Sequence, residues 1–222
     1  MKNLLIVGAR GFGRETYGFR HSFIGYGEEF TIKGFLDSAS DALDGFEGFP
    51  PIVSSVEDYE IQPDDVFVVA LGDPKMKKKY IEMIQQKGGQ FISLLSKDVL
   101  MNGNAKKIGE GSIIYGLAAL SGNVTIGNFV TILSGSIVGH DAVVDDFCML
   151  DCQSFMGGFS RLQKGASLGT GAMVMPHVTV GEYAVVNAGS VVAKDVEAGS
   201  TVMGMPAQNS RRWLRMVLQG VR

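Results

Sequence analysis

The sequence from Ile108 to Glu197 repeats every six residues without interruption. The first residue of each hexad is aliphatic, and the fifth, from Ser112 to Val196, is always Ser, Ala, Val or Cys. A register kept over this length at two constrained positions indicates a repeat architecture. The first positions are Ile108, Ile114, Leu120, Ile126, Ile132, Val138, Val144, Leu150, Met156, Leu162, Leu168, Val174, Val180, Val186 and Val192.

One hexad is too short to bury its own apolar residue, so successive turns must stack into a continuous core. Six extended residues span roughly 20 Å at most. Three such edges would close a triangular coil, which puts residue n about 4.8 Å from residue n+18. The repeat therefore predicts five coils of a parallel β-helix, with Gly, Asp or Asn accepting positive φ at the corners.

A different pattern precedes the repeat. Leu4–Val7 is an apolar run that ends at the glycine-rich loop Gly8–Gly13, and a helix is expected to begin near Arg14. A strand, a glycine loop and a helix direct backbone N–H groups at an anion, usually a phosphate. The G-x-x-G-x-G spacing differs from the dinucleotide motif G-x-G-x-x-G. A second strand, Thr31–Leu36, ends at Asp37. The Asp37 carboxylate either accepts hydrogen bonds from the ribose of a nucleotide or is a plain strand-to-turn side chain.

Two more strands are expected, at Val66–Leu71 and Phe91–Leu95, with a helix from Pro74 to near Gly88 between them. The pattern changes to hexads between Ser96 and Lys107. This predicts an α/β, Rossmann-like domain at residues 1–96 and a β-helix domain with a C-terminal tail at residues 97–222. Fewer than a hundred residues hold one mononucleotide-binding half, which argues against a nicotinamide dehydrogenase.

Composition excludes some partners. The formal net charge is −3, and the basic run Lys75–Lys79 is interpreted as a solvated helix face, so neither nucleic acid nor an anionic membrane is an expected partner. No apolar run is long enough to span a membrane, and no signal peptide opens the sequence. Cys148 and Cys152 are the two cysteines, which fits a reduced, cytoplasmic compartment.

His140 is the strongest candidate for chemistry. It stands at the third place of its hexad, where side chains leave the wall, with Asp141 beside it and Gly158 one coil later. A neutral imidazole can take a proton near pH 7, and a neighbouring carboxylate can orient it. A glycine N–H can stabilise negative charge that develops on a carbonyl oxygen. His21 and His177 are interpreted as surface or locally bonded side chains.

With these motifs in place, the chain resembles, over both domains, the hexapeptide-repeat sugar acyltransferases of the sialic acid O-acetyltransferase and UDP-N-acetylbacillosamine N-acetyltransferase type. The resemblance implies a left-handed β-helix and a cytoplasmic homotrimer with sites between neighbouring subunits. It also implies direct transfer of an acetyl group from acetyl-CoA to an amine or hydroxyl of a sugar nucleotide, without metal, in surface polysaccharide biosynthesis. The motifs that carry it are Gly8–Gly13, Gly34–Asp37, Val69–Asp73, Gly139–Asp141 and Ala188–Asp195.

The resemblance also implies residue roles. His140 would be the general base, Asp141 its partner, and the Gly158 backbone would hold the acetyl carbonyl. Cys148 and Cys152 are interpreted as packing residues. The coenzyme groove would include Met149, Gly158, Thr170 and Ala188. The nucleotide part of the acceptor would contact Arg10, Gly11, Phe12, Asp37 and Gly72.

The chain departs from the family pattern at three places. Phe12 stands where the glycine loop usually has a His, Met149 where a second His is common, and Leu133 where an Asn is frequent. Met149 cannot hydrogen-bond near the thioester as imidazole would. These departures keep open a non-catalytic trimeric β-helix that binds a nucleotide sugar. An acyltransferase for a small amino acid or antibiotic would leave the first domain without a purpose.

The C-terminal stretch Gly204–Ala207 resembles the ending found beside the coenzyme's nucleotide in this family. The residues after it are expected to form a short amphipathic helix that caps the open end of the solenoid. The sugar, the nucleobase and the choice between an amine and a hydroxyl acceptor stay open.

Overall fold

The computed structural model describes residues 1–102, 107–206 and 208–210. It divides into two compact units, one of Met1–Lys97 with Glu110–Ile113 and one of Asp98–Gly109 with Ile114–Arg222. Among the described residues, none of the helices combines the length and apolar character required to cross a membrane.

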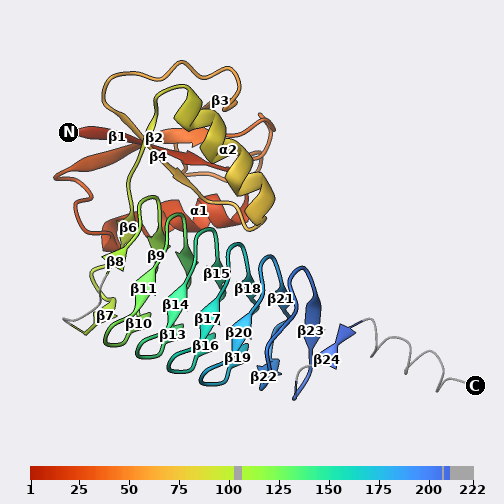
Figure 1. The fold of residues 1–222 in the computed structure, drawn as a ribbon. Helices are drawn as coiled ribbons and strands as arrows, with labels where there is room; N and C mark the ends of the chain where they lie inside the picture. Colours follow the sequence, from red (N-terminus) through yellow and green to blue (C-terminus); the bar gives the residue numbers. More distant parts are fainter. Residues whose placement is uncertain (103–106, 207, 211–222) are drawn as a thin grey trace, which may run out of the picture. The chain divides into compact units, whose positions relative to one another are not determined.

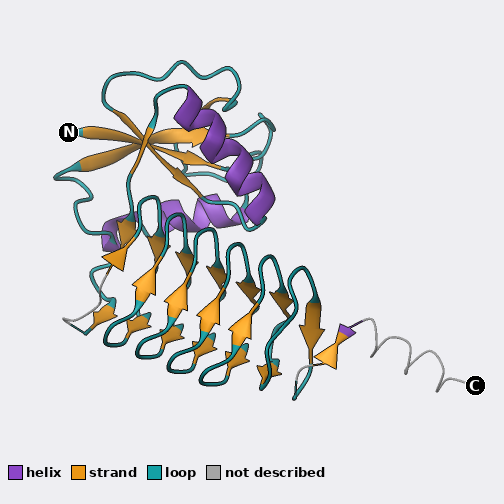
Figure 2. Ribbon diagram, viewed as in Figure 1, coloured by secondary structure: helices purple, strands orange, loops and turns teal. Residues whose placement is uncertain are grey.

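The first unit is built on a five-stranded parallel sheet in the order β3-β2-β1-β4-β5 (Figures 1 and 2). Leu4, Leu5, Ile6 and Val7 of the central strand are at most 1% exposed, as expected for a parallel strand covered on both faces. This confirms the Rossmann-like prediction. The strands are β1 (Lys2–Val7), β2 (Phe30–Leu36), β3 (Ile52–Ser54), β4 (Asp65–Val69) and β5 (Gln90–Phe91), with helices α1 (Gly11–Gly18), η1 (Arg20–Ser22) and α2 (Pro74–Gln86).

Helix α1 begins at Gly11, so the expected start near Arg14 was wrong by three residues. A β-carbon on Gly13 would collide with the carbonyl of Gly8, so the missing side chain lets the first helical turn lie against the strand end. His21 lies in the short turn η1, where its ring contacts Tyr26 edge to face, as expected for a locally bonded side chain.

Helix α2 begins as its sequence predicts, because the Asp73 side chain accepts hydrogen bonds from the N–H groups of Lys75 and Met76. The interpretation of Lys75–Lys79 as a solvated face was wrong at one position. Lys77 is 2% exposed, because it shares the buried face of the helix with Ile81 and Ile84.

The strands from β6 to β24 form the three sheets of a prism, drawn as rows of short arrows in Figure 1, and they pair in parallel except for β24, which is antiparallel to β23. We name each wall after one strand. The β10 wall contains β7 (Leu100–Met101), β10 (Ala119–Leu120), β13 (Ile137–Val138), β16 (Phe155–Met156), β19 (Met173–Val174) and β22 (Val191–Val192). The β11 wall contains β8 (Lys107–Ile108), β11 (Thr125–Ile126), β14 (Val143–Val144), β17 (Arg161–Leu162) and β20 (Thr179–Val180). The β12 wall contains β6 (Leu94–Leu95), β9 (Ile113–Ile114), β12 (Thr131–Ile132), β15 (Met149–Leu150), β18 (Ser167–Leu168), β21 (Val185–Val186), β23 (Thr201–Met203) and β24 (Gln208–Asn209).

The eighteen-residue register is confirmed on every wall. Val138, for example, pairs with Met156, and Met156 pairs with Val174. The first-position side chains from Ile114 to Val192 are at most 2% exposed, and the small fifth-position side chains are buried with them. The parallel β-helix is therefore confirmed, with the hexad aliphatics as its core.

The solenoid is longer than the repeat. Strand β7 pairs with β10 before the hexads are fully established, and β23 pairs with β21 after they end. The prediction of five coils was therefore too low, because ladder hydrogen bonds need no aliphatic side chain. The expected strand Phe91–Leu95 is instead two short strands in different sheets, β5 and β6. The predicted C-terminal capping helix lies outside the described residues.

Positive φ recurs at the fourth residue of the hexads, which is the corner position. The prediction of Gly, Asp or Asn there was incomplete. Leu117, Phe147, Gln153 and Tyr183 also adopt φ between 53° and 63°. The stacked ladder therefore imposes a left-handed corner even on side chains that disfavour it.

Candidate active site

His140 lies at the corner between the β10 and β11 walls, directly after β13. Its Nδ1 is 2.9 Å from Oδ2 of Asp141, and its side chain is 62% exposed. A carboxylate accepts hydrogen bonds, so Nδ1 carries the proton and Nε2 of the neutral ring is left as an acceptor. The corner thus presents a ring nitrogen that can remove a proton.

Gly158 lies one coil after His140 and leaves room for its ring. A β-carbon on residue 158 would stand 2.7 Å from both Cε1 and Nε2 of His140. Among the described residues, the Gly158 N–H donates to no acceptor. The residue that packs against the His140 ring therefore has a backbone N–H without an acceptor among the described residues. The structure brings together His140, Asp141 and Gly158.

Two residues that sequence reasoning missed also belong to this corner. Asn123 Nδ2 donates to Oδ1 of Asp141 at 3.2 Å, and the Phe159 ring stands perpendicular to the His140 ring at 5.2 Å between centroids. Asn123 and Phe159 each lie eighteen residues from Asp141. Applying the eighteen-residue register to side chains beside His140 would have found both.

Of the four expected coenzyme residues, Gly158 lies at this corner, and Met149, Thr170 and Ala188 do not. Thr170 and Ala188 are exposed and follow β18 and β21, at the corner between the β12 and β10 walls. Among the described residues, their N–H groups donate to no acceptor. Met149 is half-buried on β15, on the β12 wall itself. One chain therefore carries His140 at one edge of the β10 wall and Thr170 and Ala188 at the opposite edge.

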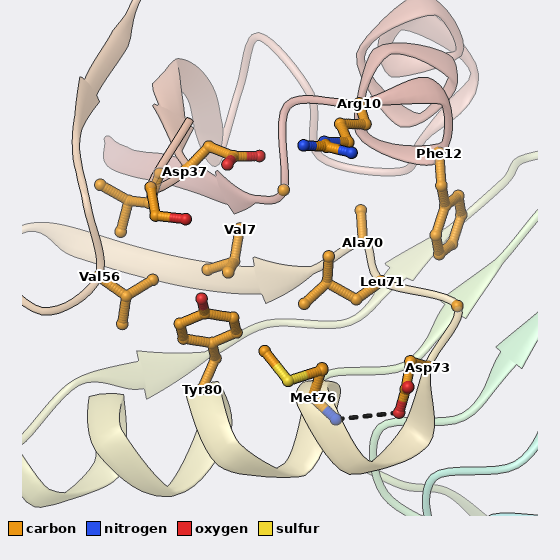
Figure 3. A pocket seen from close by; sticks show the side chains of 14 residues that line it. Val7, Arg10, Phe12, Asp37, Val56, Ala70, Leu71, Asp73, Met76 and Tyr80 are labelled. Carbon is orange, nitrogen blue, oxygen red and sulfur yellow. Dashed lines mark hydrogen bonds between the residues drawn. The ribbon is translucent and has the colours of Figure 1, made fainter. Parts of the chain in front are cut away.

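The first unit has a cavity of about 440 Å³ at the carboxyl ends of β1, β2 and β4. Figure 3 shows Tyr80 and Met76 pointing into it from α2, while Arg10 and Asp37 approach from the loops that follow β1 and β2. The carboxyl edge of a parallel sheet is where ligands bind in this class of fold. The lining includes Arg10, Phe12, Asp37 and Gly72 among the five expected residues, and Gly11 is not among the lining residues. Val56, Met76 and Tyr80 also line it and had no sequence signal.

Asp37 has a structural role in this cavity. Its Oδ2 accepts the N–H of Ala9 at 2.8 Å, and its Oδ1 accepts the N–H of Ala39 at 2.9 Å. The carboxylate therefore fixes the glycine loop to the end of β2. Each oxygen keeps a second lone pair that can still accept a ligand hydroxyl.

Neither cysteine has the environment of a nucleophile. Burial raises the pKa of the Cys148 thiol to about 12, because the charged thiolate would lie in the apolar core. Cys152 is half-buried and is not part of a disulfide. In the part of the chain that the structure describes, no three His, Cys, Asp or Glu side chains are grouped to hold a metal ion.

The coil geometry and the outward imidazole define the class of hexapeptide-repeat β-helix proteins. Comparison with known proteins narrows this class. The PglD N-terminal domain family matches residues 3–84. The acetyltransferase domain of PglB from Neisseria gonorrhoeae superposes with a TM-score of 0.83 at 25% identity, over 94% of this chain and 100% of that one. WeeI from Acinetobacter baumannii gives 0.80 at 28% identity, over 94% and 100%. The chain is therefore similar, over 94% of its length, to hexapeptide-repeat sugar acyltransferases.

The PglB domain has also been solved in complex with acetyl coenzyme A, with a TM-score of 0.82 at 25% identity, over 94% of this chain and 98% of that one. Among curated proteins, the UDP-3-O-acylglucosamine N-acyltransferase 2 of Rhodopseudomonas palustris is 36% identical over 81 residues, which is 36% of this chain. The chain covers 22% of that relative, so the match is confined to a short segment of it.

Proposed function

We propose that this chain transfers an acetyl group from acetyl-CoA to an amine or hydroxyl of a nucleotide-linked sugar. The observation that carries the proposal is the His140 corner. There, an imidazole oriented by Asp141 at 2.9 Å lies over a glycine whose N–H is unpaired among the described residues. Similarity to the PglB acetyltransferase domain, which binds acetyl coenzyme A, supports the choice of acyl donor.

In this reaction, Nε2 of His140 takes the proton of the acceptor as its nitrogen or oxygen forms a bond to the acetyl carbon. The carbon–sulfur bond breaks, and His140 returns the proton to the departing sulfur. Asp141 holds Nδ1 and stabilises the imidazolium. The Gly158 N–H donates to the acetyl oxygen as its negative charge grows. The step needs neither a covalent enzyme intermediate nor a metal.

We infer that the nucleotide part of the acceptor occupies the cavity of the first unit. The cavity has one cationic side chain, Arg10, beside the N-terminus of α1, which suits a phosphate. Its apolar wall of Val56, Met76 and Tyr80 suits a base. On this proposal residues 1–96 bind the sugar nucleotide and residues 97–222 transfer the acetyl group.

We infer further that the protein acts as a homotrimer. His140 lies at one edge of the β10 wall, and Thr170 and Ala188 lie at the other, so one acetyl-CoA can contact both groups where two subunits meet. The outward side chains of that wall are all apolar, which supports subunit packing there. They are Ala119, Ile137, Phe155, Met173 and Val191. Cys148 and Cys152 form no disulfide, which suits a reduced, cytoplasmic compartment.

The proposal is tested by measuring turnover with acetyl-CoA and a set of candidate acceptors. These are UDP- and GDP-linked amino sugars, CMP-sialic acid and free sialic acid. His140→Ala should lower kcat by about 10²–10⁴-fold and leave acetyl-CoA binding intact, because binding does not use the base. His21→Ala, in the first unit, is the matched control and should keep wild-type turnover. Wild-type turnover in His140→Ala would refute the mechanism.

A thermal-shift assay distinguishes the proposed acetyltransferase from a non-catalytic protein that binds a nucleotide sugar. A ligand that binds the native state raises the melting temperature of the protein. Acetyl-CoA and a sugar nucleotide should each raise it. A response to the nucleotide alone, with no turnover, would favour a binding protein without catalysis.

A further inference from the structure

The fourth residues of four hexads form a column beside His140. Asn123, Asp141, Phe159 and His177 stand eighteen residues apart and all have positive φ, between 59° and 64°. Asn123 donates to Asp141 at 3.2 Å, and the rings of Phe159 and His177 lie parallel, 5.0 Å apart at 3°. Side-chain contacts therefore link the coil before His140 with the two coils after it.

Two members of this column hold different parts of the imidazole. The Asp141 carboxylate fixes Nδ1 at 2.9 Å and is itself held by Asn123. The Phe159 ring meets the His140 ring at 90°, the favoured edge-to-face arrangement of aromatic rings. The backbone N–H of Phe159 also donates to the backbone carbonyl of His140 at 3.0 Å. The first contact sets the direction of Nδ1, and the second limits the tilt of the ring.

Packing alone does not account for Phe159. A non-glycine residue in the left-handed region costs roughly 1–2 kcal/mol, and glycine fills the same place at Gly135, Gly165 and Gly171. Phe129 has the same backbone but is 4% exposed and stacked on Phe147, so burial offsets its cost. Phe159 is 53% exposed. Its ring contacts are the two histidines.

We propose that Asn123 and Phe159 are positioning residues for His140. Asn123 acts through the Asp141 carboxylate, and Phe159, supported by His177, acts on the plane of the imidazole. The proposal rests on the proposed function of His140 as general base. A readout that does not depend on turnover is therefore part of its test.

A double-mutant cycle tests Asn123. Asn123→Gly and Asp141→Gly both keep a residue that accepts positive φ, so the corner is preserved. Asn123→Gly should lower kcat about 5- to 10-fold, a coupling typical of contacting residues, and leave the KM for acetyl-CoA unchanged. In the Asp141→Gly background the further loss should be less than about 2-fold. An equal loss in both backgrounds would show that Asn123 does not act through Asp141.

Phe159→Asn removes the ring and keeps a side chain that tolerates the left-handed region. It should lower kcat about 10-fold without lowering the melting temperature, and Phe159→Tyr should retain activity. The matched control is Gln153→Asn, since Gln153 is exposed at the same place of its hexad with φ 59° but lies in another column. Wild-type turnover in Phe159→Asn, or an equal loss in the control, would overturn the role of Phe159.

The independent readout is the ¹H–¹³C NMR signal of the His140 Cε1 group, assigned by its loss in His140→Gln. The Phe159 ring current should displace the chemical shift of this signal. In Phe159→Asn this displacement should be lost and the signal should broaden. Broadening is also expected in Asn123→Gly. An unchanged signal in both variants overturns the positioning proposal even in an active enzyme. If the wild-type protein has no transferase activity but the signal changes in the two variants, the positioning role is supported and the proposed function is refuted.

Discussion

The imidazole of His140 occupies the space that a side chain on residue 158 would need. Gly158 is therefore required for the shape of the site as well as for its N–H. Its backbone is not left-handed, so the requirement comes from the neighbouring ring and not from φ. The geometry of the proposed catalytic corner thus depends on the absence of a β-carbon at residue 158.

Gly158→Ala should lower turnover by about 10²-fold, because displacement of a reacting group by about 1 Å has this cost. The matched control is Gly122→Ala, one coil before His140 in the same column. Its new β-carbon would find its nearest neighbour, Asn102, at an ordinary 3.6 Å. Steady-state kinetics and melting temperatures of both variants check this. Equal activity in the two would mean that His140 tolerates displacement.

Asp37→Ala should destabilise the protein by about 1–3 kcal/mol, because the buried N–H of Ala9 loses its acceptor. It should also weaken nucleotide binding, since the glycine loop is no longer held. Denaturant unfolding and a nucleotide titration measure the two effects. Asp41→Ala, an exposed carboxylate in the following loop, should change stability by less than about 0.5 kcal/mol. A full loss of binding without loss of stability would assign Asp37 to the ligand alone.

At the scale of the element, the hexad repeat predicted the walls, the register and the buried positions, because each depends on a period that the sequence displays. It did not predict the left-handed corners at Leu117 or Gln153, since backbone conformation there is imposed by ladders on neighbouring coils. It also missed Asn123 and Phe159. The pattern marks outward positions without stating which side chains meet across coils.

Leu117→Gly should stabilise the protein by about 0.5–1 kcal/mol. Relief of the left-handed cost exceeds the extra entropy that glycine loses on folding. Leu117 is 70% exposed, so little burial is lost with its side chain. The reverse substitution, Gly171→Leu, lies in the same column at φ 67° with open space around it. It should destabilise by about 1–2 kcal/mol. Urea unfolding of both variants decides the matter, and a destabilised Leu117→Gly would contradict the strain argument.

At the scale of the whole molecule, sequence analysis and structure agree on the two kinds of fold in one chain. His140 lies at one edge of the β10 wall, and Thr170 and Ala188 lie at the other. The sequence could therefore predict a catalytic group and a coenzyme group, but not where the two groups lie relative to each other. The cavity wall of Val56, Met76 and Tyr80 was beyond prediction, because a loop and a helix contribute it through tertiary packing.

The double variant Ile137→Glu/Met173→Glu should convert the proposed trimer to monomers and abolish turnover. It places charges on the apolar β10 wall, where the two native side chains are 41% and 40% exposed. Thr125→Glu/Val143→Glu, on the β11 wall, is the control and should remain trimeric and active. Light scattering after size-exclusion chromatography measures the mass. A wild-type mass of one chain would refute the trimer.

The eighteen-residue pairing also constrains how such a chain can grow. Tandem duplication of eighteen residues would add one coil to the prism and preserve the register of the ladder hydrogen bonds. Within Asn123–His177, however, the new coil would separate side chains that are now in contact. Insertion of whole coils is therefore compatible with the His140 corner only outside that interval, so this segment has a fixed length in a scaffold that can otherwise be extended.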